Sequence, residues 1–260
     1  MSNAPNRGPR RDPRADRDSA AKVELRRAAA ALTKEAGLPT NLAHQVALGN
    51  ITLNDVVERL AKRDRVDTLT RKHELPKSLA TQIALGQADL DQVLIKRRLA
   101  AHLEANRDRS SLAAAAAANT LVVLGVHDAG LLRGHIREVG QYEVHIHLDS
   151  GEMATVHKLR VKYMTDDVHA KGARNQIRRD KERPERCEPI WKPQDRYGCS
   201  DRRLFGFIDE QAEVQVTLLE GEVLRGLPTW MGRWEFGMVL PKKKAEIIIF
   251  RHALADVRRA

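Results

Sequence analysis

The hydrophobic positions divide the chain into a region with helical spacing and a later region with strand-like spacing. Between residues 22 and 106, Leu, Val, Ala and Ile recur every three or four positions, as on one face of a helix. From Leu121 onward, apolar residues alternate with polar ones or form short runs bounded by turn residues, which is typical of strands. We therefore expect an all-α N-terminal region followed by a region of short strands.

The helical region contains an internal repeat. The segment LPTNLAHQVALG at 38–49 returns as LPKSLATQIALG at 75–86. In each copy the proline suits the first turn of a helix, the glycine suits a left-handed C-cap, and Thr52 or Asp89 then suits the N-cap of a second helix. The sequence therefore predicts two helix-turn-helix units within a helical repeat module at 22–108. Because the shared positions are mainly apolar, we favour a packing or interaction module over a DNA reader.

Two segments outside these regions are rich in charge and poor in apolar residues. Residues 1–21 contain mainly Arg, Pro, Asp and Asn at their start, which predicts a disordered basic tail. Residues 167–198 are rich in Arg and Lys without an apolar period, which predicts a basic linker. Trp191 in this linker can anchor it to a neighbouring domain or stack on a base, and we favour anchoring.

The strand-rich residues form two similar regions, 110–166 and 199–260. With an offset of about 92 residues, the matches are Leu132-Arg133-Gly134 with Leu224-Arg225-Gly226, Asp128 with Glu220, and Tyr142 with Trp234. A glycine within a strand permits the sharp bend that a small barrel needs. The pattern therefore predicts a duplicated small β-domain, and each copy follows a short helical segment.

The second copy carries a motif that points to a family. Residues 214–226 and the run Phe250-Arg251-His252-Ala253-Leu254 resemble the two halves of an Sm-like domain of the bacterial Hfq type, whose last motif is aromatic-Lys-His-Ala-Ile. The resemblance implies an α+β multidomain chain, with N-terminal all-α helical repeats followed by two small bent five-stranded Sm-like β-barrels. Because subunits of that family close into rings by pairing strand edges, the two copies can pair with each other or with other chains. The resemblance therefore also implies a homo-oligomer, with a trimer forming a pseudo-hexameric ring as one form.

The same resemblance assigns RNA-binding roles in the second copy. Arg251 and His252 would line a uridine-binding face near the ring pore, with Phe250 beside them. Trp234 takes the position of a ring that stacks on a base, and Arg233 takes that of its polar neighbour. The alternative roles are core packing for the two aromatic rings and a solvated strand end for Arg251 and His252.

The first copy matches the family less well. Gln141 and Tyr142 fit the stacking position and its polar neighbour. In the last motif, Lys158 can take the basic position with Leu159 in place of the histidine, whereas a shifted register places His157 on the histidine. The sequence leaves both registers open.

Composition narrows the class of partner. The net charge of +10 favours an anionic partner, most often nucleic acid. Without a bilayer-length apolar run or a signal peptide, the expected compartment is the cytoplasm. Cys187 and Cys199 lack the spacing of a zinc knuckle, and His145 and His147 share a strand face without a third ligand, so we expect no metal and no cofactor.

Together these features predict a protein that binds U-rich or A-rich single-stranded RNA, as an Hfq-like RNA chaperone or post-transcriptional regulator. The alternative is a protein-interaction scaffold that uses Sm-like edge pairing, with the helical repeats recruiting a protein partner and without specific RNA binding. No nucleophile–base–acid set, carboxylate pair or phosphate loop is evident, so we do not expect an enzyme.

Overall fold

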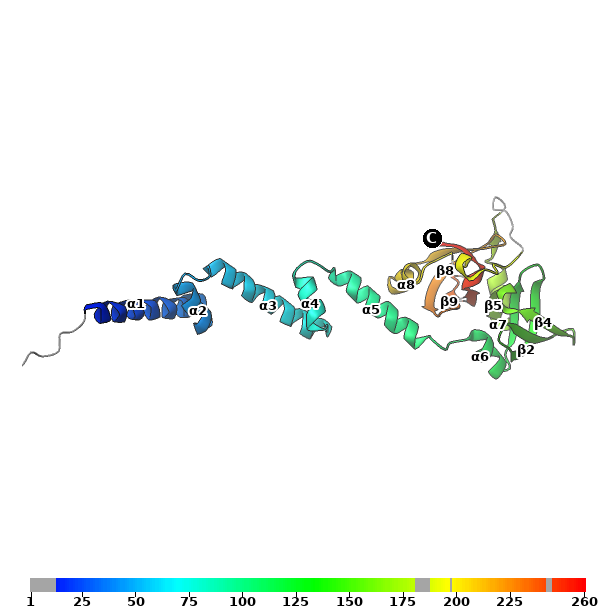
Figure 1. Cartoon of the computed structure of the whole chain (residues 1–260). Coiled ribbons are helices and arrows are strands. Elements are labelled where there is room, and N and C mark those ends of the chain that lie inside the picture. Colours follow the sequence, from blue (N-terminus) through cyan, green and yellow to red (C-terminus); the bar gives the residue numbers. More distant parts are fainter. Residues whose placement is uncertain (1–12, 181–187, 197, 242–244) are drawn as a thin grey trace, which may run out of the picture. The chain divides into compact units, whose positions relative to one another are not determined.

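The computed structural model describes residues 13–180, 188–196, 198–241 and 245–260. The chain divides into two compact units, Met1–Gln92 and Val93–Ala260. The first is helical, and the second contains the strands (Figure 1). Within the described residues, no helix combines the length and the apolar character that a membrane crossing requires.

The first unit confirms the predicted all-α N-terminal region. Its helices are α1 (Pro13–Ala36), α2 (Thr40–Ala47), α3 (Leu53–His73) and α4 (Lys77–Ala84), and α5 (Leu90–Ala105) continues into the second unit. In both repeats the short helix follows a proline, and a glycine with a φ of +73° or +72° comes two residues after its end. Of the predicted disordered tail 1–21, residues 1–12 lie outside the described residues, and α1 begins at Pro13.

Local capping and apolar packing explain this unit. The Thr52 hydroxyl accepts a hydrogen bond from the Asp55 amide at 3.1 Å, and the Asp55 carboxylate accepts one from the Thr52 amide, so the two residues cap α3. Ala29, Ala43 and Val56 from three successive helices are buried in one apolar cluster. The repeated apolar positions therefore join neighbouring helices into a core.

The second unit contains the strands and the helices that flank them. The strands are β1 (Leu121–Val126), β2 (Gly130–Val139), β3 (Glu143–Leu148), β4 (Met153–His157), β5 (Val161–Asp166), β6 (Arg178–Arg179), β7 (Val214–Leu218), β8 (Glu222–Met231), β9 (Glu235–Val239), β10 (Glu246–Phe250) and β11 (Leu254–Arg259). The helices are α6 (Ser111–Ala117), α7 (Asp167–Arg174) and α8 (Asp201–Asp209), with 3-10 turns η1 (Lys158–Arg160), η2 (Pro193–Asp195) and η3 (Arg251–Ala253). Thus α7, β6 and η2 fall within residues 167–198, the range predicted as a basic linker.

The prediction of two small closed five-stranded β-barrels is wrong. Across the described residues, the strands form one open antiparallel sheet of eleven strands, in the order β11-β7-β8-β9-β10-β5-β1-β2-β3-β4, with β6 beside β8. The ladder continues because β10 pairs with β5, with Ile248 opposite Met164 and Ile249 opposite Tyr163. An open strand edge carries unpaired backbone donors and acceptors, and these two edges satisfy each other.

The sheet nevertheless contains the predicted duplication. We call α6 with β1–β5 the first half and α8 with β7–β11 the second half. Each half places its last strand beside its first and then continues in chain order, β5-β1-β2-β3-β4 and β11-β7-β8-β9-β10. Each half has its own apolar core, but Trp230, Ile248 and Phe250 of the second half lie in the core of the first. The halves therefore share a hydrophobic interface.

A buried polar cluster also joins the two halves. Lys162 on β5 is 3% exposed, and its ammonium forms ion pairs with Glu220 and Glu222. The Nδ1 atom of buried His127 lies 2.9 Å from Oε1 of Glu220. Burial acts to raise the pKa of Glu220, but the hydrogen bond and charge of Lys162 outweigh it, so the pKa lies below its ordinary value.

Candidate nucleic-acid interface

Corresponding hydrogen bonds fix the alignment of the two halves. The Arg251 amide donates to the carbonyl of Trp234 at 2.8 Å, and the Lys158 amide donates to the carbonyl of Tyr142 at 2.7 Å. The 3-10 turns η3 and η1 begin at Arg251 and Lys158. Lys158 therefore corresponds to Arg251, and Leu159 replaces the histidine in the first half. This settles the register that the sequence left open.

The second half presents an aromatic ring and cationic side chains in one cavity, which we call the Trp234 pocket. Its volume is about 1030 Å³, and its walls come from α5, the chain after it, the segment before α8, the first residue of α8, the β8–β9 turn and η3. The side chain of Trp234 is 49% exposed, and the guanidinium carbon of exposed Arg233 lies 4.5 Å from the centre of its ring. The lining residues are Ala100, Leu103, Glu104, Arg107, Asp108, Pro193, Arg196, Asp201, Arg233, Trp234 and Arg251.

A tight turn explains why Trp234 is exposed. The Gly232 amide donates to the carbonyl of Glu235 at 2.8 Å, which closes the turn between β8 and β9. Trp234 lies at this turn, whereas the carboxylate of Glu235 is buried and accepts a hydrogen bond from the Ser111 amide at 2.7 Å. Glu235 thus anchors the turn to the protein interior, while the indole of Trp234 stays at the surface.

Arg251 lies beneath the exposed pair instead of projecting from it. Its guanidinium donates to the carbonyls of Gly232 and Arg233, both at 3.4 Å, and to that of Cys199 at 3.2 Å. It also lies 2.6 Å from the carboxylate of Asp201. Because the side chain is buried and its two terminal amino groups contact these carbonyls and Asp201, it positions the turn that carries Trp234 and offers little surface to a phosphate.

Phe250 and His252 are buried as well. The Nε2–H of His252 donates to the carbonyl of Val161 in the first half at 2.9 Å, and its ring centre lies 5.8 Å from that of Phe250. Burial lowers the pKa of His252 to about 4, so the imidazole is neutral at physiological pH. In this arrangement both rings belong to the junction between the halves.

The first half brings its predicted residues together around exposed rings. Tyr142 is 63% exposed, and its ring is stacked nearly parallel on that of His157 with centres 6.3 Å apart. The Gln141 amide donates to the Tyr142 hydroxyl at 3.0 Å. Lys158 follows His157 and is half-buried.

The sequence predicted that Trp191 anchors its segment to a neighbouring domain, but it did not assign the contact of this ring or the two arginines Arg107 and Arg196 to these surfaces. The exposed ring of Trp191 meets His157 edge-on with centres 5.1 Å apart, so the segment before α8 extends the Tyr142 surface. Arg196 donates to the carbonyl of Ile190 at 2.9 Å and lines the Trp234 pocket together with Arg107. The only sequence signal for Arg196 was its place in a basic segment with an aromatic residue, and that signal does not place it beside a particular strand. Arg107 follows α5 and lies outside that segment.

Metal-ligating side chains do not gather at any one place in the part of the chain that the structure describes. The described residues contain no group of three or more His, Cys, Asp or Glu side chains placed to hold a metal ion. Cys199 is a buried free thiol, and Cys187 lies outside the described residues.

Comparison with known proteins does not identify a family for this chain: no protein-family model matches it, and no curated protein matches it.

Proposed function

We propose that this chain is an Hfq-like protein that binds single-stranded RNA in the cytoplasm, as an RNA chaperone or post-transcriptional regulator and not as an enzyme. The observation that carries the proposal is the Trp234 pocket. There an exposed indole stacks with the Arg233 guanidinium, in a cavity that Arg107 and Arg196 also line.

The chemistry of this pocket suits unpaired bases. Stacking of a base on an aromatic ring contributes about 1–3 kcal/mol and tolerates different bases, because every base has a π-face. Guanidinium groups next to the ring can bind the phosphates on either side of a stacked base. Bases inside a duplex are not available for such stacking, so the expected ligand is single-stranded and U-rich or A-rich.

The order of elements in the two halves supports the Hfq-like part of the proposal, although the halves are not closed barrels. Both halves have a short helix before the strands and the same strand order, and both end in a 3-10 turn and a last strand. The proposal includes a homo-oligomer, for which the resemblance implies a trimer as a pseudo-hexameric ring. Tyr142 with His157 and Trp191 forms a second candidate surface, in the first half.

One observation favours the alternative function of a protein-interaction scaffold. In the first unit, the apolar side chains of Leu48, Leu53 and Val57 are exposed around the end of α2 and the start of α3. Such side chains can recruit a protein partner without any contribution from the RNA pocket.

A direct titration separates the two functions. Fluorescence anisotropy of labelled U-rich and A-rich single strands, with a duplex of equal length as control, should give tight binding of a single strand that weakens as salt rises. Equal affinity for the duplex, or no binding at moderate salt, would reject the RNA proposal and leave the scaffold.

A further inference from the structure

The helix α7 lies against β1, β5 and β10, and beside it is a cavity that we call the α7 pocket. Its volume is about 480 Å³, and its walls come from β1, β2, β5, α7 and the chain that follows α7. A volume of this size suits a small molecule. The α7 pocket shares no lining residue with the Trp234 pocket, so the two are separate sites.

The alternation of side chains along the strands produces the floor of this pocket. Leu124 and Met164 lie in the core of the first half, so their neighbours Val123 and Tyr163 lie on the opposite face of the sheet. An added Cβ at Gly125 would lie 2.3 Å from the ring of Tyr163, so the glycine allows this ring to lie close against β1. The floor of the pocket is therefore mainly apolar.

Two contacts hold α7 in place over the sheet. Nε and Nη2 of Arg133 donate to the two carboxylate oxygens of Asp167, the first residue of α7, at 2.6 and 2.9 Å. The remaining amino group of Arg133 pairs with Asp149. Near the end of the helix, Ala173 is buried in one apolar cluster with Tyr163. Because both ends of α7 are anchored, the pocket is formed before any ligand binds.

Two further cations line the pocket from α7. Lys171 and Arg174 lie one helical turn apart, and both side chains are exposed. Within the residues that the structure describes, no carboxylate pairs with either of them, whereas Arg133 is paired with Asp167. Burial raises the pKa of Tyr163 to about 12 and the charge of Arg174 opposes this rise, so a neutral hydroxyl lies near this cation.

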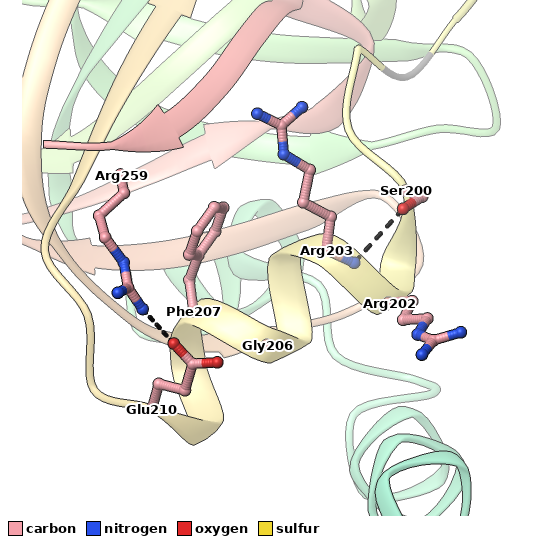
Figure 2. Close-up of a pocket in the computed structure, with 7 residues that line it drawn as sticks. All are labelled: Ser200, Arg202, Arg203, Gly206, Phe207, Glu210 and Arg259. Atoms are coloured by element: carbon pink, nitrogen blue, oxygen red, sulfur yellow. Dashed lines mark hydrogen bonds and ion pairs between the residues drawn. The ribbon is translucent and has the colours of Figure 1, made fainter. Parts of the chain in front are cut away.

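A groove beside α8 shows how these two cations differ from other exposed arginines. It has a volume of about 420 Å³, and Arg203 and Arg259 are among the residues that line it (Figure 2). Arg259 pairs with Glu210, and a guanidinium nitrogen of Arg203 lies 3.7 Å from the carboxylate of Asp256. The protein itself neutralises these arginines, whereas the two cations of α7 are available to an anion from outside.

We propose that the α7 pocket binds a small aromatic carboxylate, with its ring against Val123, Leu131 and Ile177 and its negative charge on Lys171 and Arg174. Three cationic side chains and one carboxylate line the pocket, which gives it a net charge of +2. Leu131 is 45% exposed, and a ring placed on it removes apolar surface from water. This site goes beyond the proposed RNA binding and does not depend on it.

An anionic fluorescent probe tests the role of the two cations. Anilinonaphthalene sulfonate, titrated into full-length protein that ribonuclease has freed of RNA, should bind saturably at one site. Lys171→Ala and Arg174→Ala should each raise its dissociation constant about fivefold, the upper range for an exposed ion pair. Arg203→Ala in the groove beside α8 and Arg233→Ala in the Trp234 pocket remove exposed arginines elsewhere and should leave it unchanged.

Two competitors with the same ring test the class of ligand on the wild-type protein alone. Indole acetate should displace the probe, whereas tryptamine, which carries an amine in place of the carboxylate, should not. Absence of saturable probe binding, equal affinity of the Lys171→Ala, Arg174→Ala and wild-type proteins, or equal displacement by tryptamine would each overturn the proposal. Far-UV circular dichroism of each variant separates misfolding from loss of the site.

Discussion

The backbone amide of Arg251 donates a hydrogen bond to the carbonyl of Trp234 at 2.8 Å, which joins a buried cation to an exposed indole. The guanidinium of the same arginine holds the turn from below, through the carbonyls of Gly232 and Arg233. The residue that the motif assigned to RNA contact therefore supports the ring that is available for contact. This relationship separates variants that damage the fold from variants that damage the pocket surface.

Arg251→Ala should destabilise the second unit. The substitution removes the partner of Asp201 and leaves the carbonyl of Cys199 without this donor, so we expect the free energy of unfolding to fall by about 2–3 kcal/mol. Arg233→Ala, next to the same ring but exposed, should change it by less than about 0.5 kcal/mol. Urea denaturation of the three proteins measures both values, and equal stabilities would contradict the supporting role of Arg251.

Arg233→Ala should instead change the salt dependence of RNA binding. Each phosphate contact to a single strand contributes about −0.7 to the slope of log affinity against log salt concentration, so loss of one contact should flatten the slope by that amount. Arg137→Ala on β2, which removes an exposed arginine outside the Trp234 pocket, should leave the slope unchanged. Parallel slopes for Arg233→Ala and the wild type would exclude a phosphate contact at Arg233.

His252 should make stability depend on pH. Its pKa is about 4 in the folded protein and near 6.5 when unfolded, so the unfolded state binds more protons between these values. The stability is complete above pH 6.5 and is lost as the pH falls toward 4, by about 2 kcal/mol between pH 7.5 and pH 5. His252→Gln, which keeps a donor for the Val161 carbonyl, should lose this part of the pH dependence. Urea denaturation at the two pH values measures it, and an identical pH dependence in the variant would show that His252 does not cause it.

Lys162→Ala should destabilise the junction between the halves. It leaves Glu220 and Glu222 as largely buried carboxylates without their ion-pair partner, which costs about 3–5 kcal/mol. Lys158→Ala, four residues earlier and half-buried, should cost far less. Thermal unfolding of the two variants compares the losses, and a Lys162→Ala protein as stable as Lys158→Ala would show that the cluster does not hold the halves together.

The duplication could be predicted from the sequence because equivalent positions of the two halves require glycine for steric reasons. Gly134 and Gly226 occupy equivalent strand positions, where an added Cβ would lie 2.2 Å from the carbonyl oxygen of His147 and 2.6 Å from that of Val239. The close approach of the next strand, and not only a bend, accounts for glycine at both sites. A steric requirement of this kind can be recognised in the sequence as a glycine at the same position of both copies.

Edge pairing between the two copies was expected as one possibility, but the strands that pair, β10 and β5, and their register were not predictable in the same way. Their pairing joins Ile248 to Met164 through backbone groups that every residue carries, so no side-chain pattern reveals it. The burial of Arg251 and His252 follows from that junction and from Asp201, and the contact of Trp191 with His157 depends on the path of the segment before α8. These features depend on tertiary arrangement, whereas the motif records only residue types.

The central claim is that single-stranded RNA stacks on Trp234, and the affinity of Trp234→Ala tests it most directly. The matched control is Leu131→Ala, which removes an exposed apolar side chain outside the pocket. Anisotropy titration with a U-rich and an A-rich strand should show that Trp234→Ala weakens binding of the preferred strand about tenfold, the loss of one stacked base, while Leu131→Ala binds as the wild type does. Equal affinity of Trp234→Ala and the wild type for both strands would contradict the account.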